Sequence, residues 1–83
     1  MDRYFFHTEC DIRHTDSEGV PLADMTAARK AAAESVAALL KDGAHVFWGT
    51  KPWTMTVTDE RGLIFFVIEV HGQDAPAVMN STR

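Results

Sequence analysis

The first stretch of regular alternation between side-chain types covers residues 3–10. Aromatic and β-favouring side chains dominate it, and a period of two places Tyr4 and Phe6 on one face and Phe5 and His7 on the other. This pattern predicts a first β-strand with one face toward a core.

Turn-forming residues follow, with Asp, Ser, Thr and Gly concentrated in residues 11–19. After them, Val20–Leu22 can form only a short edge strand, because Pro21 has no backbone N–H to donate. The two strands are therefore expected to make an uneven hairpin.

Residues 25–42 lack Gly and Pro and are rich in alanine, which predicts one long helix. Asp24 is expected to cap its start, and Gly43 is expected to end it in a left-handed conformation. One narrow stripe at helical spacing is made of small or apolar side chains: Met25, Ala28, Ala32, Ser35 or Val36, and Leu39. Such a stripe lets the helix lie close to a sheet.

Two further strands are expected after the helix. Trp53–Thr58 alternates large apolar residues with threonine, as in an antiparallel strand with one face in water. Residues 59–62 form a tight turn with Gly62 at the position that tolerates a positive φ. The last strand, Leu63–Val70, is apolar on both faces, so we expect it at the centre of the sheet.

These elements predict an α+β fold of ββαββ topology: an antiparallel sheet of about four strands with one long helix packed on one face. Residues 1–71 are expected to form a single domain, and residues 72–83 a mobile C-terminal tail. The predicted core is Tyr4, Phe6, Val36, Leu39, Val57, Ile64, Phe66 and Ile68.

Chain length and charge narrow the function classes. A chain of 83 residues buries only about 63% of its unfolded surface, so a lone monomer is marginally stable. The formal net charge is −4 and the basic residues are scattered, which argues against a nucleic-acid surface. The longest apolar run is far shorter than a membrane span, no signal peptide is apparent, and the single cysteine cannot form an intramolecular disulfide. We therefore expect a cytoplasmic protein that does not enter the membrane.

The sharpest candidate chemistry is a metal site on two strand faces. His7 and Glu9 share one face of the first strand, and Glu69 and His71 share one face of the last, so neighbouring strands would bring them together. The alternative is that each polar pair lies where its strand meets water. No metal motif supports the site, and Cys10 lies on the opposite face from His7. We therefore predict no catalytic residues, no metal, no cofactor and no enzymatic activity.

Several short segments together resemble a small bacterial family known only as a domain of unknown function. They are Arg3-Tyr4-Phe5-Phe6-His7, the turn with Gly19 and Leu22, Asp24 with Ala28-Arg29, and Trp53 with Val57-Thr58-Asp59-Glu60-Arg61-Gly62. The resemblance covers roughly residues 3–70 and implies a compact ββαββ domain in a soluble bacterial protein. It implies no activity and no ligand-binding residues.

The function that the sequence favours is a non-enzymatic module that self-associates or binds another protein. One helix covers one sheet face, and the other face is expected to carry a contiguous apolar patch. The predicted interface residues are Phe5, Leu63, Phe65 and Val67, and a homodimer is the favoured assembly. The alternatives are an antitoxin-like dimeric regulator that binds nucleic acid or a toxin, and a metal or small-ligand binder.

Overall fold

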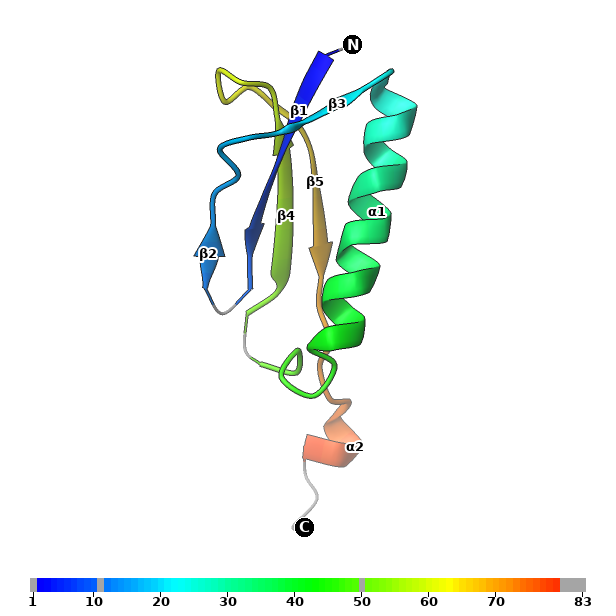
Figure 1. The fold of residues 1–83 in the computed structure, drawn as a ribbon. Coiled ribbons are helices and arrows are strands. Elements are labelled where there is room, and N and C mark those ends of the chain that lie inside the picture. The colour runs from blue at the N-terminus through cyan, green and yellow to red at the C-terminus, as the bar shows by residue number, and fades with distance from the viewer. Residues whose placement is uncertain (1, 11, 50, 80–83) are drawn as a thin grey trace.

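The computed structural model describes residues 2–10, 12–49 and 51–79. In chain order the elements are β1 (Asp2–Glu9), β2 (Arg13–His14), β3 (Val20–Leu22), α1 (Met25–Asp42), β4 (Trp53–Thr58), β5 (Ile64–Val70) and α2 (Pro76–Met79). The strands form one sheet in the order β2-β1-β4-β5, with α1 along one of its faces (Figure 1). The predicted α+β fold with a single long helix is confirmed.

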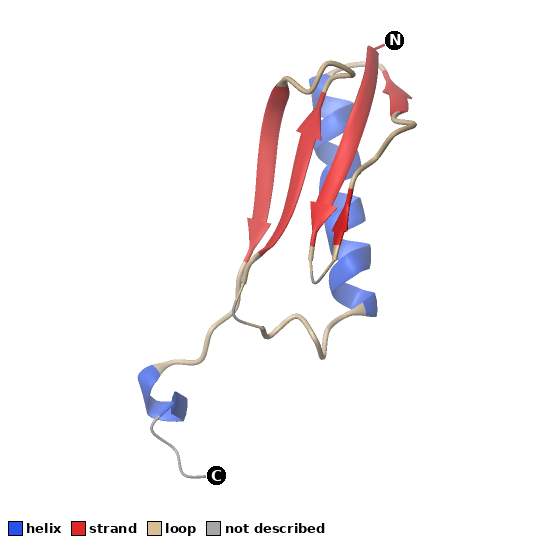
Figure 2. Ribbon diagram, turned by 90° about the vertical axis from the view of Figure 1, so that its left-hand side faces the viewer, coloured by secondary structure: helices blue, strands red, loops and turns tan. Residues whose placement is uncertain are grey.

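The edge hairpin is divided into two pieces. β3 pairs with the beginning of β1 and β2 with its end, both antiparallel, and Figure 2 shows them on the side of β1 away from β4. The short strand at Val20–Leu22 was predicted, whereas β2 lies inside the segment predicted as a turn.

Helix α1 begins and ends where the sequence predicts. The Asp24 carboxylate accepts from the Ala27 N–H at 2.8 Å, and Ala28 and Ala32 are fully buried against the sheet. The left-handed end predicted at Gly43 is wrong, because its φ is −112°. Gly43 instead allows a close approach, since a Cβ there would lie 2.6 Å from the Trp53 ring.

The core lies between α1 and the covered face of β1 and β4. Its buried apolar residues are Tyr4, Ala28, Ala32, Trp53, Met55 and Val57, with Phe6, Leu22, Met25, Val36, Phe66 and Ile68 packed against them. Two predicted core residues differ: Leu39 is 36% exposed and Ile64 is 58% exposed.

The prediction that the last strand is central is wrong. Among the described strands, β5 pairs with β4 alone and forms the end of the sheet, while β4 lies between β1 and β5. A register shift opposite Val57 and Thr58 also interrupts the alternation of β5: Val57 pairs with Phe66, but Thr58 pairs with Ile64. This bulge moves Ile64 off the core face, which explains its exposure.

The predicted C-terminal tail contains one short helical element. α2 is a single turn that projects from the end of the body farthest from the N-terminus (Figure 1). Residues 80–83 of the predicted tail lie outside the described residues.

Candidate interaction site

The sheet face opposite α1, here called the open face, carries no other element of the described chain (Figure 2). Strand alternation and register place nine residues on it, in three rows that run from β1 through β4 to β5. The rows are Phe5, Thr58 and Ile64; His7, Thr56 and Val67; and Glu9, Thr54 and Glu69. The face is therefore polar over β1 and β4 and more apolar along β5.

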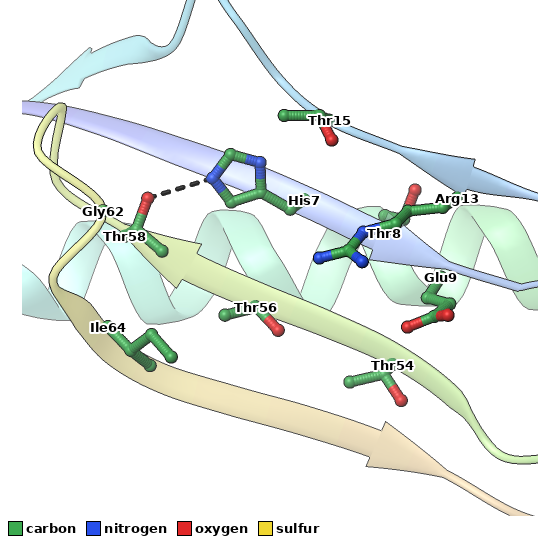
Figure 3. A pocket seen from close by; sticks show the side chains of 10 residues that line it. All are labelled: His7, Thr8, Glu9, Arg13, Thr15, Thr54, Thr56, Thr58, Gly62 and Ile64. Carbon is green, nitrogen blue, oxygen red and sulfur yellow. Dashed lines mark hydrogen bonds between the residues drawn. The ribbon is translucent and has the colours of Figure 1, made fainter.

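A shallow hollow of about 350 Å³ lies over β1 and β4 on this face. Figure 3 shows its side chains in front of the sheet with α1 behind. The lining residues are His7, Thr8, Glu9, Arg13, Thr15, Thr54, Thr56, Thr58, Gly62 and Ile64. Hydroxyl groups dominate this lining, because every second residue of β4 is a threonine.

His7 is held by hydrogen bonds at both ring nitrogens. The Asp16 backbone N–H donates to Nδ1 at 3.1 Å, and Nε2 lies 3.0 Å from the Thr58 Oγ1 (Figure 3). Since Nδ1 accepts, the ring proton lies on Nε2, which donates to Thr58. The Thr58 hydroxyl in turn donates to the Asp59 carbonyl at 2.9 Å.

This arrangement determines what the histidine can do chemically. A histidine acts as general base toward a hydroxyl only through a nitrogen that can accept its proton. At Thr58 the nearby nitrogen is already a donor, and the hydroxyl proton is directed at a backbone carbonyl. The geometry therefore positions His7 as a structural link between β1 and β4 and does not activate Thr58.

Asp16 fixes the loop between β2 and β3. One carboxylate oxygen accepts from the N–H groups of Glu18 and Gly19 at 3.0 and 3.1 Å, and the other accepts from Phe6 N–H at 3.1 Å. Burial acts to raise the pKa of this carboxyl, but the hydrogen bonds from three backbone N–H donors outweigh it, so the pKa lies below its ordinary 3.8. The carboxylate thus takes the place of a strand carbonyl on the edge of β1.

The four residues considered for a metal site do not converge. β4 separates β1 from β5, so Glu9 and Glu69 lie on either side of Thr54, about 10 Å apart at normal strand spacing. His71 lines a different hollow, beside Trp48. In the described part of the chain, no group of three or more His, Cys, Asp or Glu residues could hold a metal ion.

The predicted interface residues occupy three different environments. Val67 lies on the open face and is 47% exposed, Leu63 precedes β5 and is 63% exposed, and Phe5 is half-buried against Gly19. Phe65 departs from the prediction, because the bulge turns its ring toward the core residue Tyr4, with 5.6 Å between centroids. Ile64, predicted in the core, lies on the open face instead.

Sequence reasoning gave no role to Asp16. Asp16 lies two residues before Glu18 and three before Gly19, a spacing that is typical of an Asx turn. This spacing indicates the hydrogen bonds from the two backbone N–H groups to the Asp16 carboxylate. The bond to Phe6, ten residues away, depends on how the loop lies along β1, for which the local sequence carries no signal.

A family model described as a domain of unknown function, DUF6894, matches residues 3–71. The chain belongs to the DUF6894 family. The match covers β1 to β5, so the open face and the hollow both lie inside the DUF6894 domain, whereas α2 lies outside it. The resemblance found in the sequence is thereby confirmed.

No curated protein and no solved structure matches the chain. No helix in the described ranges is long and apolar enough to cross a bilayer.

Proposed function

We propose that this DUF6894 domain is a non-enzymatic module that acts by self-association, as a homodimer formed through the side of the sheet that β5 provides. The observation that carries this proposal is the exposure of the apolar side chains along β5. Leu63, Ile64 and Val67 are all more than 45% exposed, and Phe65 is 37% exposed. Several exposed apolar side chains at one side of a sheet are typical of an interaction surface.

The total surface supports the same proposal. The chain exposes 6308 Å², against about 4,900 Å² for a compact monomer of this length. The projecting C-terminal segment accounts for part of this excess, and the side chains of β5 add to it.

The small core gives self-association an energetic role. Among the residues that the structure describes, six apolar ones are buried, and two of them are alanines whose burial contributes little. Covering about 300 Å² of apolar surface per protomer would contribute about 7.5 kcal/mol for each protomer at about 25 cal/mol per Å², before the costs of association. A dimer would therefore raise the stability of a domain that is marginal alone.

The polar part of the open face favours contact at β5 over stacking of two whole sheets. Stacked sheets would bury the three threonines of β4 together with Glu9 and Arg13, and each of these polar side chains would be taken out of water at a cost in free energy. An interface centred on β5 buries one charged side chain of that strand at most, Glu69. We therefore place the contact along β5.

The first experiment is sedimentation equilibrium of the chain and of Val67→Asp. We expect a dimer at micromolar concentration and a shift to monomer in the variant, because the new carboxylate would be desolvated in the interface. Val67 is a better position than Phe65, whose ring also contacts Tyr4 in the core.

Val20→Asp is the matched control. Val20 is 44% exposed and lies on β3, at the opposite side of the sheet. It should leave the dimer intact. A wild-type monomer at high micromolar concentration would contradict self-association and leave β5 as a surface for a different protein partner.

A further inference from the structure

We propose that two copies of the chain join by antiparallel pairing of β5 with β5, around a two-fold axis at Val67, which makes one continuous sheet from both protomers. This inference rests on the proposed self-association and specifies its geometry. The same operation places both α1 helices on the same side of the joined sheet, because a two-fold axis perpendicular to a sheet preserves its faces.

The two borders of the sheet differ in their capacity to pair. On one border, β2 has two residues and β3 has three, including Pro21, which cannot donate to a further strand. Between them the Asp16 carboxylate accepts the hydrogen bond of the Phe6 N–H, so this donor is not available to a further strand. Short strands, proline and side-chain plugs are the devices that protect sheet borders from pairing.

Apart from the bulge at its start, the β5 border carries no such device. It is seven residues long, contains no proline or glycine, and has one charged residue, Glu69. Figure 2 shows no other element of the described chain beside its outer side. A long apolar border strand of this kind is a template for another strand.

The charge position on β5 fits a second copy of the same strand. An antiparallel register centred on Val67 pairs Val67 with Val67 and Phe66 with Ile68, and it places Glu69 opposite the bulged start of the partner strand. The two Glu69 side chains are then four residues apart along the strands, about 14 Å, which exceeds the Debye length of about 8 Å at physiological ionic strength. Their repulsion is therefore largely screened.

The paired side chains are also complementary in type. Val67 of each copy meets its counterpart on the open face, while Phe66 and Ile68 meet on the face that carries α1. Pairs between aromatic and β-branched residues are among the stabilising cross-strand pairs. Phe66, Ile68 and Val70 are only half-buried within one chain, so the pairing would also cover core-facing surface.

Disulfide trapping tests the register directly. In a Cys10→Ser background, which removes the only cysteine, Val67→Cys should cross-link rapidly under a mild added oxidant. Directly opposed residues in an antiparallel pair have Cα atoms about 4.5 to 5.5 Å apart, within the range of a disulfide. Glu69→Cys should cross-link at least tenfold more slowly, since its copies lie about 14 Å apart. Val20→Cys on β3 is the control for random collision.

The outcomes separate this inference from the proposed function. A dimer in sedimentation with equal trapping at residues 67, 69 and 20 would overturn the β5 pairing and leave self-association standing. A monomer in sedimentation would remove both. Selective trapping at residue 67, together with slower amide exchange in β5 at higher protein concentration, would support the pairing.

Discussion

At the scale of single residues, Asp16 determines how the border of β1 is closed. Its two carboxylate oxygens accept from three backbone N–H groups, and its own N–H holds the His7 ring. The side chain thus accepts three charge-assisted hydrogen bonds, which compensate for the backbone hydrogen bonds that are missing where the edge strand breaks between β2 and β3. The loop is therefore ordered by one carboxylate.

Asp16→Asn is expected to lower the free energy of unfolding by about 1–3 kcal/mol at neutral pH. The amide has one acceptor oxygen, so its NH₂ group would face a backbone donor. Glu18→Gln is the matched control, because it removes one negative charge from the same loop at an exposed side chain. Urea titrations of both variants measure the difference, and an equal effect of the two would contradict the role assigned to the Asp16 hydrogen bonds.

The contribution of Asp16 to the free energy of unfolding depends on pH with a defined sign. The pKa of Asp16 is lowered in the folded state, so its contribution to stability is present above the ordinary value of 3.8. The contribution is lost as the pH falls through the lowered pKa. The difference between wild type and Asp16→Asn, measured by urea titration at several pH values, should therefore shrink in acid. A constant difference would show that the carboxylate charge is irrelevant.

At the scale of elements, local sequence signals predicted α1 and β4. The position of β5 in the sheet depends instead on how it pairs with β4. The Asp24 cap, the alanine-rich stripe and the threonine alternation are all encoded within a few residues. The bulge that exchanges Ile64 and Phe65 depends on how β5 aligns with β4, so period-two counting assigned both to the wrong faces. The sequence therefore predicted the exposure of Leu63 and Val67, whereas the exposure of Ile64 depends on strand register.

The junction between α1 and β4 depends on the absence of a side chain at Gly43. Gly43→Ala would place a Cβ 2.6 Å from the buried Trp53 ring, while its φ of −112° is open to any residue. The effect is therefore steric, and we expect a loss of about 1–3 kcal/mol in stability. Gly49→Ala is the control, since no atom lies within 4 Å of its added Cβ. Thermal unfolding of both variants measures the difference, and equal midpoints would contradict the close packing of Gly43 against the Trp53 ring.

At the scale of the whole molecule, strand order determines which surfaces remain uncovered. The apolar character of β5 on both faces suggested a central strand, which is the usual reason for such a composition. In the structure β5 is a border strand, so this composition requires a different explanation. Pairing with a second copy would make β5 an internal strand of the assembly, in agreement with its sequence.

The assembled state should be visible in thermal unfolding. When a dimer unfolds to two separate chains, its midpoint rises with protein concentration by mass action. With about 2.1 cal/mol/K of unfolding entropy per residue over two chains of 83 residues, each tenfold increase in concentration should raise Tm by about 4 °C.

Val67→Asp should unfold at a lower Tm that does not change with concentration, whereas Val20→Asp should retain the dependence. Because β5 carries only one charged residue, the increase of Tm with protein concentration should be nearly the same in low and high salt. A wild-type Tm that is constant over a hundredfold range of concentration, measured by calorimetry below and above the micromolar region, would count against dimer-linked folding.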